Sequence, residues 1–267
     1  MLSTVMGYLA VGAVSGFFAG LLGIGGGIVL VPALVWLLAG NGYPAEFVFQ
    51  AALGTSMATI LFTAASSLRA HHARGAVMWP IVRIFAPGVL IGALFGSVLV
   101  RHIPTFSLTV VFCAFLLFVA LQMGLELKPR AGRLLPAWPG LLAVAGGIGV
   151  MSSLVAVGGG AMTVPFLVWC NVSIRHAIGT SAAVGLPIAV GGSLGYVIGG
   201  WPIASLPAGS LGFVYLPALL WTVLASALTA PLGARAVAKL PARVLRRIFA
   251  LLLIGVAVYM LSRLSRA

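Results

Sequence analysis

Acidic side chains are almost absent from this 267-residue sequence, which contains only Glu46 and Glu126. Both adjoin the ends of apolar runs, so no carboxylate is expected inside a membrane, and a carboxylate proton relay of the kind found in pumps is not expected. Histidines and cysteines are too few for the clustered groups of an enzyme active site. Cys113 and Cys170 are interpreted as small buried hydrophobes. No nucleotide-binding motif occurs, so neither ATP nor another cofactor is expected.

Apolar residues fill most of the sequence. They make up 62% of it, and the mean hydropathy is +1.21. A water-soluble protein of this length cannot bury so much apolar surface. We therefore expect an all-α polytopic membrane protein with about eight membrane segments. The net charge of +13 comes from basic residues in short loops between apolar runs, a pattern that sets membrane orientation and does not indicate nucleic-acid binding.

A glycine-broken apolar segment occurs twice. Residues 16–36 read GFFAGLLGIGGGIVLVPALVW and residues 149–169 read GVMSSLVAVGGGAMTVPFLVW, with 10 of 21 positions identical at an offset of 133. One helix over residues 5–39 would extend about 50 Å, longer than a bilayer requires. We expect two short helices instead, over residues 5–22 and 28–39, that meet near the membrane interior. Duplicated, interrupted apolar segments are typical of a transporter binding site.

Two other local patterns stand out. The tetrad Leu-Gly-Thr-Ser at residues 53–56 returns as Ile-Gly-Thr-Ser at residues 178–181, each time after a polar turn. Gly88, Gly92 and Gly96 are four residues apart and share one helix face. This spacing predicts a stripe of small residues through which two helices approach closely.

The basic loops predict how two halves are arranged. We divide the chain into a first transmembrane repeat (1–125), a cytoplasmic linker (126–139) and a second transmembrane repeat (140–267). The basic loop at residues 69–74 is placed inside. Four full crossings in each half would then place the basic loop 235–247 outside, against the positive-inside rule. If each broken block returns to its own side, 11 of the 15 Lys and Arg residues lie inside. We therefore expect two inverted-topology repeats, each a re-entrant segment plus three transmembrane helices, although eight full crossings remain open.

The combination of these motifs resembles the sulfite exporter TauE/SafE family of bacterial inner-membrane transporters. The residues that carry the resemblance are 16–27 with Pro32, 52–56, 157–160 with Pro165, 178–181 and 206–214. It covers nearly the whole chain. The resemblance implies a multi-pass protein of the bacterial inner (cell) membrane that exports small sulfur-containing anions such as sulfite or organosulfonates.

The duplicated glycines are the first candidates for a substrate site. Broken helices present free N–H groups and positive helix ends, which suit an anion without a buried Lys or Arg, whereas the alternative is helix packing through small residues. The hydroxyls of the tetrads could bind sulfonate oxygens, or they could bond to their own helix carbonyls or cap their helices. The predicted substrate-binding residues are Gly25, Gly26, Gly27, Thr55, Ser56, Gly158, Gly159, Gly160, Thr180 and Ser181.

Two basic residues are candidates for gating or coupling. Arg83 could attract substrate at a cytoplasmic vestibule, although snorkelling to lipid headgroups is the plainer interpretation. His176 lies four residues before Thr180, so both lie on one helix face, which makes it the best histidine candidate. No catalytic residue and no metal ligand is predicted.

We therefore expect a secondary transporter, not an enzyme, that exports a small sulfur-containing anion held at the membrane midplane. The expected partners are the anion and the lipid bilayer, with no nucleic acid. A homodimer, the coupling ion and the direction of transport in the cell stay open. The alternatives are a passive anion channel, which would need an open polar pore, and a carrier of the same fold for another small solute.

Overall fold

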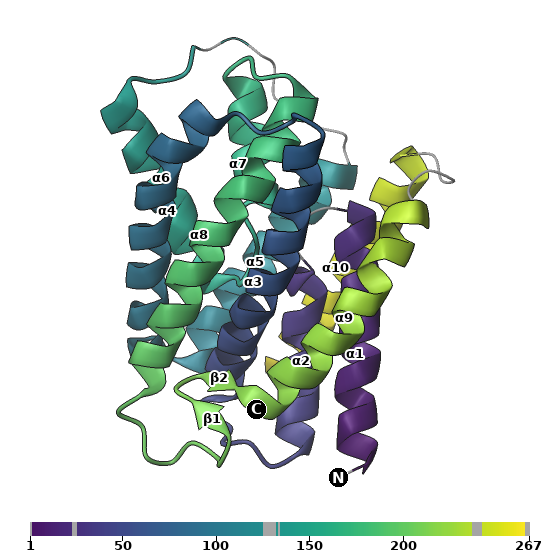
Figure 1. The fold of residues 1–267 in the computed structure, drawn as a ribbon. Coiled ribbons are helices and arrows are strands. Elements are labelled where there is room, and N and C mark those ends of the chain that lie inside the picture. Colours follow the sequence, from purple (N-terminus) through teal and green to yellow (C-terminus); the bar gives the residue numbers. More distant parts are fainter. Residues whose placement is uncertain (1, 23–25, 125–131, 133, 237–241, 265–267) are drawn as a thin grey trace.

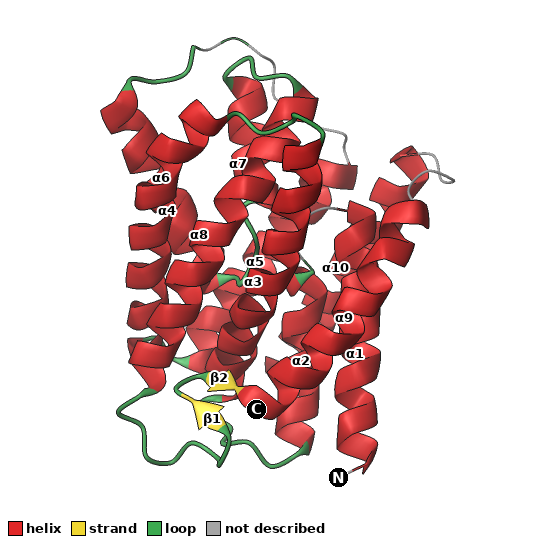
Figure 2. Ribbon diagram, in the orientation of Figure 1, coloured by secondary structure: helices red, strands yellow, loops and turns green. Residues whose placement is uncertain are grey.

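The structure, a computed structural model, describes residues 2–22, 26–124, 132, 134–236 and 242–264. Within these ranges the chain is helical nearly throughout, with one short hairpin of strands (Figure 2). The long helices run side by side along the vertical direction of Figure 1, so the molecule has two ends. We call the end with the N- and C-termini the lower end, and the opposite end the upper end.

Each glycine-broken segment forms two helices that do not continue into one another. In the first half these are α1 (Leu2–Leu22) and α2 (Gly27–Gly40), and in the second half α6 (Trp138–Leu154) and α7 (Gly160–Trp169). The predicted pair over residues 5–22 and 28–39 is thus confirmed to within a few residues at each end. Pro32 and Pro165 both lie inside the second, shorter helix of their pair.

Each half then adds three longer helices. The bounds are α3 (Val48–Ala73), α4 (Trp79–Leu99), η1 (Val100–His102) and α5 (Thr105–Gly124) in the first half, and α8 (Ile174–Gly200), β1 (Ser210–Leu211), β2 (Val214–Tyr215), α9 (Leu216–Ala236) and α10 (Ala242–Leu264) in the second. α3 rises to the upper end and α4 returns, whereas α8 descends to the lower end and α9 returns (Figure 1).

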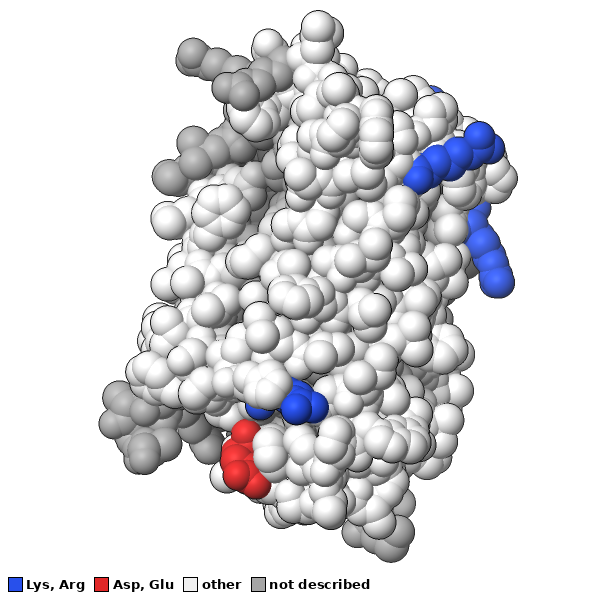
Figure 3. All heavy atoms as spheres, turned by 90° about the vertical axis from the view of Figure 1, so that its left-hand side faces the viewer, with Lys and Arg blue, Asp and Glu red and all other residues white. Residues whose placement is uncertain are grey.

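The helices have the length and surface of a membrane protein. Five described helices, α1, α3, α4, α5 and α8, are long and apolar enough to cross a membrane, and the apolar parts of the other five are shorter. On the face drawn in Figure 3, the few charged side chains lie at the upper right edge and in the lower third, and most of the face is uncharged. The chain is therefore a multi-pass membrane protein, while the expected number of about eight segments stays a prediction.

The glycine stripe on α4 packs against α6, as its spacing predicts. A methyl group at Gly92 would collide with the carbonyl oxygen of Gly146, and one at Gly88 would lie 2.8 Å from Ala145 Cβ. α1 packs on α9 in the same way, with Gly16 against Ser226, so each broken pair is seated on a helix of the other half.

Three boundaries differ from the sequence prediction. The loop expected over residues 235–247 is largely helical, because α9 continues to Ala236 and α10 begins at Ala242. α6 begins at Trp138, two residues inside the predicted linker, most of which lies outside the described residues. The strands β1 and β2 form a short hairpin that the sequence analysis did not predict, pairing Ser210 with Tyr215 and Leu211 with Val214.

Candidate functional site

The two helix breaks meet inside the protein. Gly27, the first residue of α2, lies against the backbone of Ala156 in the break before α7, because a methyl group at Gly27 would collide with the Ala156 carbonyl oxygen. The same methyl group would lie 3.1 Å from Ser56 Oγ of α3. Gly26 and Gly27 of the first break and Ser56 of the first tetrad are thus brought together, whereas Gly25 lies outside the described residues.

The second break also adjoins the second tetrad. Gly158 and Gly159 are buried, and Gly160 is partly buried at the start of α7. A methyl group at Gly159 would lie 3.2 Å from the Ser181 carbonyl oxygen of α8. The predicted grouping of the second glycine run with Ser181 therefore occurs, and it involves the backbone of Ser181.

The two breaks turn at different residues. Gly26 has φ +59°, in the left-handed region that favours glycine. In the second half Ala156 has φ +45°, whereas Gly159 has φ −51°. An alanine in this region is uncommon and strained. Gly159 therefore serves close approach to α8 more than backbone conformation.

Both short helices begin at the breaks without a side-chain cap. Gly26 and Gly159 are the N-cap residues of α2 and α7, and neither supplies a capping hydrogen bond from a side chain. The N–H groups at the start of a helix have no partner within the helix, and they carry the positive end of its dipole. Two such ends inside a protein can hold an anion without a charged side chain.

Two hydroxyls beside these helix ends are buried and unpartnered. Ser56 Oγ and Thr163 Oγ1 have no hydrogen-bond partner in the part of the chain that the structure describes, and both residues are 0% exposed. Thr163 lies in the first turn of α7, 3.4 Å from a methyl group placed at Gly159. Because an unmade buried hydrogen bond costs free energy, each hydroxyl is a plausible contact for a bound oxygen atom.

Sequence reasoning missed Thr163. The residue that matches it in the first half, at the offset of 133, is Leu30, so the duplication gives no signal for it. The one available signal was a hydroxyl three residues after the second glycine run. Tyr8, Ser152 and Ser193 are the other residues with buried, unpartnered side-chain oxygens in the described ranges.

The tetrad threonines are already bonded, and not in the ways expected. Thr55 Oγ1 accepts a 3.0 Å bond from the backbone N–H of Tyr215, and Thr180 Oγ1 accepts a 3.0 Å bond from that of Met78. Both threonines lie well inside their helices, so the expected capping role is wrong. In each case the partner lies in the other half of the chain.

Arg83 and His176 lie away from the breaks. Arg83 is exposed on α4, one turn from the upper end, where its side chain can snorkel to headgroups. His176 lies in the first turn of α8, and its Nδ1 is 2.9 Å from the hydroxyl of Ser173, the N-cap residue. This contact places the imidazole in the helix cap. Among the described residues no charged side chain is buried, so neither residue brings a charge to the breaks.

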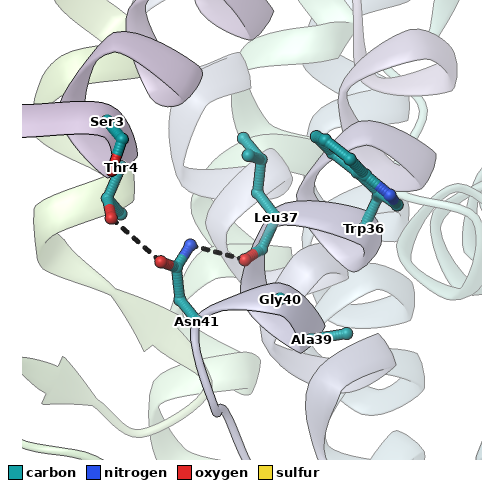
Figure 4. A pocket seen from close by; sticks show the side chains of 7 residues that line it. All are labelled: Ser3, Thr4, Trp36, Leu37, Ala39, Gly40 and Asn41. Carbon is teal, nitrogen blue, oxygen red and sulfur yellow. Dashed lines mark hydrogen bonds between the residues drawn. The ribbon is translucent and has the colours of Figure 1, made fainter.

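A groove at the lower end is separate from this site. It has a volume of about 440 Å³ and lies between the start of α1 and the end of α2 (Figure 4). Asn41 spans it, since Thr4 Oγ1 donates to Asn41 Oδ1 at 2.9 Å and Asn41 Nδ2 donates to the Leu37 carbonyl at 2.6 Å. These bonds join the outer ends of the first broken pair. Nearby, burial raises the pKa of the Tyr43 phenol, which keeps it neutral.

Known proteins match the chain over most of its length. The family model described as "Sulfite exporter TauE/SafE" matches residues 8–260. A "probable membrane transporter protein" of Haemophilus influenzae is 38% identical over 262 residues, which cover 97% of this chain and 99% of that protein. The "probable membrane transporter protein YdhB" of Bacillus subtilis is 28% identical over 193 residues, or 70% of this chain and 76% of that protein. A third, from Xylella fastidiosa, is 29% identical over 94% of this chain and 93% of that protein. No solved structure matches significantly.

Proposed function

Because the chain belongs to the sulfite exporter TauE/SafE family, we propose that it is a secondary transporter that exports a small sulfur-containing anion, of the sulfite or organosulfonate class, across the bacterial inner membrane. The observation that carries this proposal is the meeting of two helix breaks inside the protein, each followed by an uncapped helix and each with an unpartnered hydroxyl beside it. Its relatives are named as membrane transporters, and the proposed action on the substrate is likewise transport.

The chemistry of the site favours a small oxyanion. Backbone N–H groups at the start of α2 and α7 and the hydroxyls of Ser56 and Thr163 all donate hydrogen bonds to oxygen atoms. The helix dipoles add partial positive charge without a permanent cation. In this site only the anion carries a full charge, so it is bound less tightly than it would be in a salt bridge with a buried Arg or Lys. Thr55 and Thr180 keep their hydroxyl hydrogens while accepting a backbone bond, so they stay predicted ligands.

Two inverted-topology repeats account for the site. Equivalent contacts in the two halves support this arrangement: Gly16 lies against Ser226 as Gly149 lies against Val89. In such an arrangement α1 with α2, and α6 with α7, enter from opposite sides as re-entrant segments, and their tips meet at the midplane. The upper end, which carries Arg69, Arg74 and Arg175, is then cytoplasmic under the positive-inside rule.

The experiment that tests the function is a thermal-shift series on the purified protein. Sulfite, thiosulfate, sulfoacetate, taurine and sulfate are compared at matched ionic strength, because a bound ligand raises the melting temperature by mass action. We expect a rise with sulfite or with one of the sulfonates, and the series shows whether sulfate is bound as well. Gly26→Leu should abolish the rise, since a side chain there is strained at φ +59° and a Cβ would lie 3.1 Å from Ala19 Cβ.

The matched control is Gly40→Leu, at the far end of α2, where a Cβ would meet nothing within 4 Å. This variant should keep the ligand-dependent rise. If no anion raises the melting temperature, the proposal of an anion carrier is withdrawn in favour of a carrier of the same fold for another solute. A transport rate in proteoliposomes that does not saturate as the anion concentration rises would favour the passive channel instead.

A further inference from the structure

We propose that Thr55 and Thr180 are positioning residues that fasten the two chain segments closing opposite ends of the transport path. This inference deepens the proposed function and rests on it, since it takes the meeting point of the helix breaks to be the substrate site. We call residues 209–215, before α9, the lower connection and residues 74–78, before α4, the upper connection. Thr55 holds the lower connection and Thr180 holds the upper one.

The lower connection is held by consecutive residues of α3. A methyl group at Gly54 would lie 2.6 Å from the carbonyl oxygen of Phe213, so only glycine lets this backbone come so close. Two residues further along the connection, the N–H of Tyr215 donates to Thr55 Oγ1 at 3.0 Å. The Phe213 side chain is 0% exposed, and its ring lies 5.8 Å from that of Phe47. This connection therefore forms a buried plug at the lower end.

The upper connection is held by the matching residues of α8. A methyl group at Gly179 would collide with the carbonyl oxygen of Ala76. Two residues further along, the N–H of Met78 donates to Thr180 Oγ1 at 3.0 Å. Ala76 is 2% exposed, so this connection too places a buried residue in the bundle.

We call each of these two contacts a clasp, and both have the same arrangement. In each, the glycine of a Gly-Thr pair leaves room for a backbone carbonyl of the connection, and the threonine hydroxyl accepts a hydrogen bond from the N–H two residues later. The first-half pair holds a second-half connection, and the second-half pair holds a first-half connection. Because Gly54-Thr55 and Gly179-Thr180 belong to the duplicated tetrads, the motif is explained by a contact that local sequence does not reveal.

Each connection has a means of moving once it is released. Gly209 and Gly212 lie in the lower connection with φ +87° and +56°, and Gly75 lies in the upper one with φ +64°. Glycine changes backbone conformation at low cost. Other polar contacts add to each clasp. At the lower end the Phe213 N–H donates to the Tyr196 carbonyl of α8 at 3.1 Å, and Tyr43 Oη lies 3.3 Å from Ser210 Oγ; at the upper end Arg175 donates to the Arg74 carbonyl at 2.8 Å.

Both hydrogen bonds are made in this structure, and Ser56 and Ser181 behind them are 0% and 3% exposed. In the proposal this is a state closed at both ends. Transport then requires each clasp to open in turn. Loss of one threonine hydroxyl removes a hydrogen bond from one end only, and the proposal therefore predicts a one-sided effect. A threonine that merely stabilises the fold would loosen both ends alike.

The test is sided labelling of cysteines placed behind the clasps. Cys113→Ala and Cys170→Ala remove the native thiols. Ser56→Cys then reports on the lower end and Ser181→Cys on the upper end, with a membrane-impermeant methanethiosulfonate reagent added to right-side-out or inside-out membrane vesicles. Thr55→Val should raise the labelling rate of Ser56→Cys from the lower side about fivefold, as expected for one lost hydrogen bond, and leave Ser181→Cys unchanged.

Thr180→Val should give the converse, raising the labelling of Ser181→Cys from the upper side only. Thr55→Ser and Thr180→Ser keep the hydroxyl and should restore slow labelling. If a valine variant fails to accumulate, the smaller Thr55→Ala and Thr180→Ala take its place. Equal acceleration at both reporters, no acceleration, or failure of serine to restore slow labelling overturns the proposal. Because labelling needs no sulfite, a wrong substrate and a wrong clasp give different results.

Discussion

Ser56 and Thr163 show how single residues can mark a binding site in a protein with no buried charge among its described residues. A buried hydroxyl without a partner costs about 1–3 kcal/mol relative to a satisfied one. Most buried polar atoms find partners, so two orphans beside two uncapped helix ends are informative. In the proposed function, an oxyanion that accepts their hydrogen bonds offsets this free-energy cost.

Removing these hydroxyls should separate stability from binding. We expect Ser56→Ala and Thr163→Val to leave the melting temperature of the ligand-free protein unchanged or to raise it, because no protein hydrogen bond is lost. Each should reduce the sulfite-dependent rise, with an affinity loss of about tenfold or more for one hydrogen bond to a charged group. Thermal shift with sulfite titration measures both quantities.

Ser193→Ala is the matched control for the two hydroxyl variants. Ser193 Oγ is also buried and unpartnered among the described residues, but it lies three helical turns beyond Ser181 on α8. Its removal should leave the sulfite response intact. An equal loss of response in Ser193→Ala would show that the effect does not come from the site.

At the scale of the element, the glycine stripe of α4 sets how closely α4 and α6 pack. We expect Gly92→Ala to destabilise the protein by about 1–3 kcal/mol, because its methyl group would collide with the Gly146 carbonyl and the helices would have to separate. Gly147→Ala, on α6, meets nothing within 4 Å and should be neutral or slightly stabilising.

The measurement for the stripe is the midpoint of thermal unfolding in detergent, with both variants compared with the unsubstituted protein. A drop for Gly92→Ala alone is the expected outcome. Equal midpoints for the two variants would contradict the packing inferred for α4 and α6.

Elements were predictable where the sequence carries a local signal. The glycine runs locate the breaks before α2 and α7, since three consecutive glycines weaken an apolar helix far more than the single glycines of α4 do. The spacing of Gly88, Gly92 and Gly96 likewise predicts a packed face. The hairpin of β1 and β2 was missed because strands of two residues show no periodicity. The start of α10 was predicted too late in the sequence, because the basic residues at 243–247 suggested a loop.

At the scale of the whole molecule, the sequence predicted which residues repeat but not which residues touch. Thr55 and Thr180 were recognised as a pair, yet their partners, Tyr215 and Met78, lie 160 and 102 residues away along the chain. No local propensity encodes a contact of that separation. The same holds for Thr163, which has no hydroxyl counterpart in the first half.

Transport by the whole molecule should respond to membrane potential. An inside-negative potential favours outward movement of an anion by about 2.3 kcal/mol per charge per 100 mV, which corresponds to about a 50-fold shift in the equilibrium distribution for one net charge. We therefore expect sulfite export from proteoliposomes to be accelerated by a potassium diffusion potential that is negative inside. The measurement is efflux with valinomycin under imposed potassium gradients.

Reversing the potassium gradient should slow the export, and protein-free liposomes give the background. Efflux that is indifferent to the sign of the potential would contradict an electrogenic exporter. It would point instead to movement compensated by a coupled ion.

The exchanged clasps also bear on how the protein is made. While the first half is being synthesised, Thr55 has no Tyr215 to bind, and the segment before α4 has no Thr180 to hold it. A nascent chain stopped at the linker therefore lacks the partners of both contacts, and membrane proteases would be expected to recognise it as incompletely folded. Two halves supplied as separate polypeptides bring every partner between them, so the gene could be split at the linker without losing the information needed to assemble.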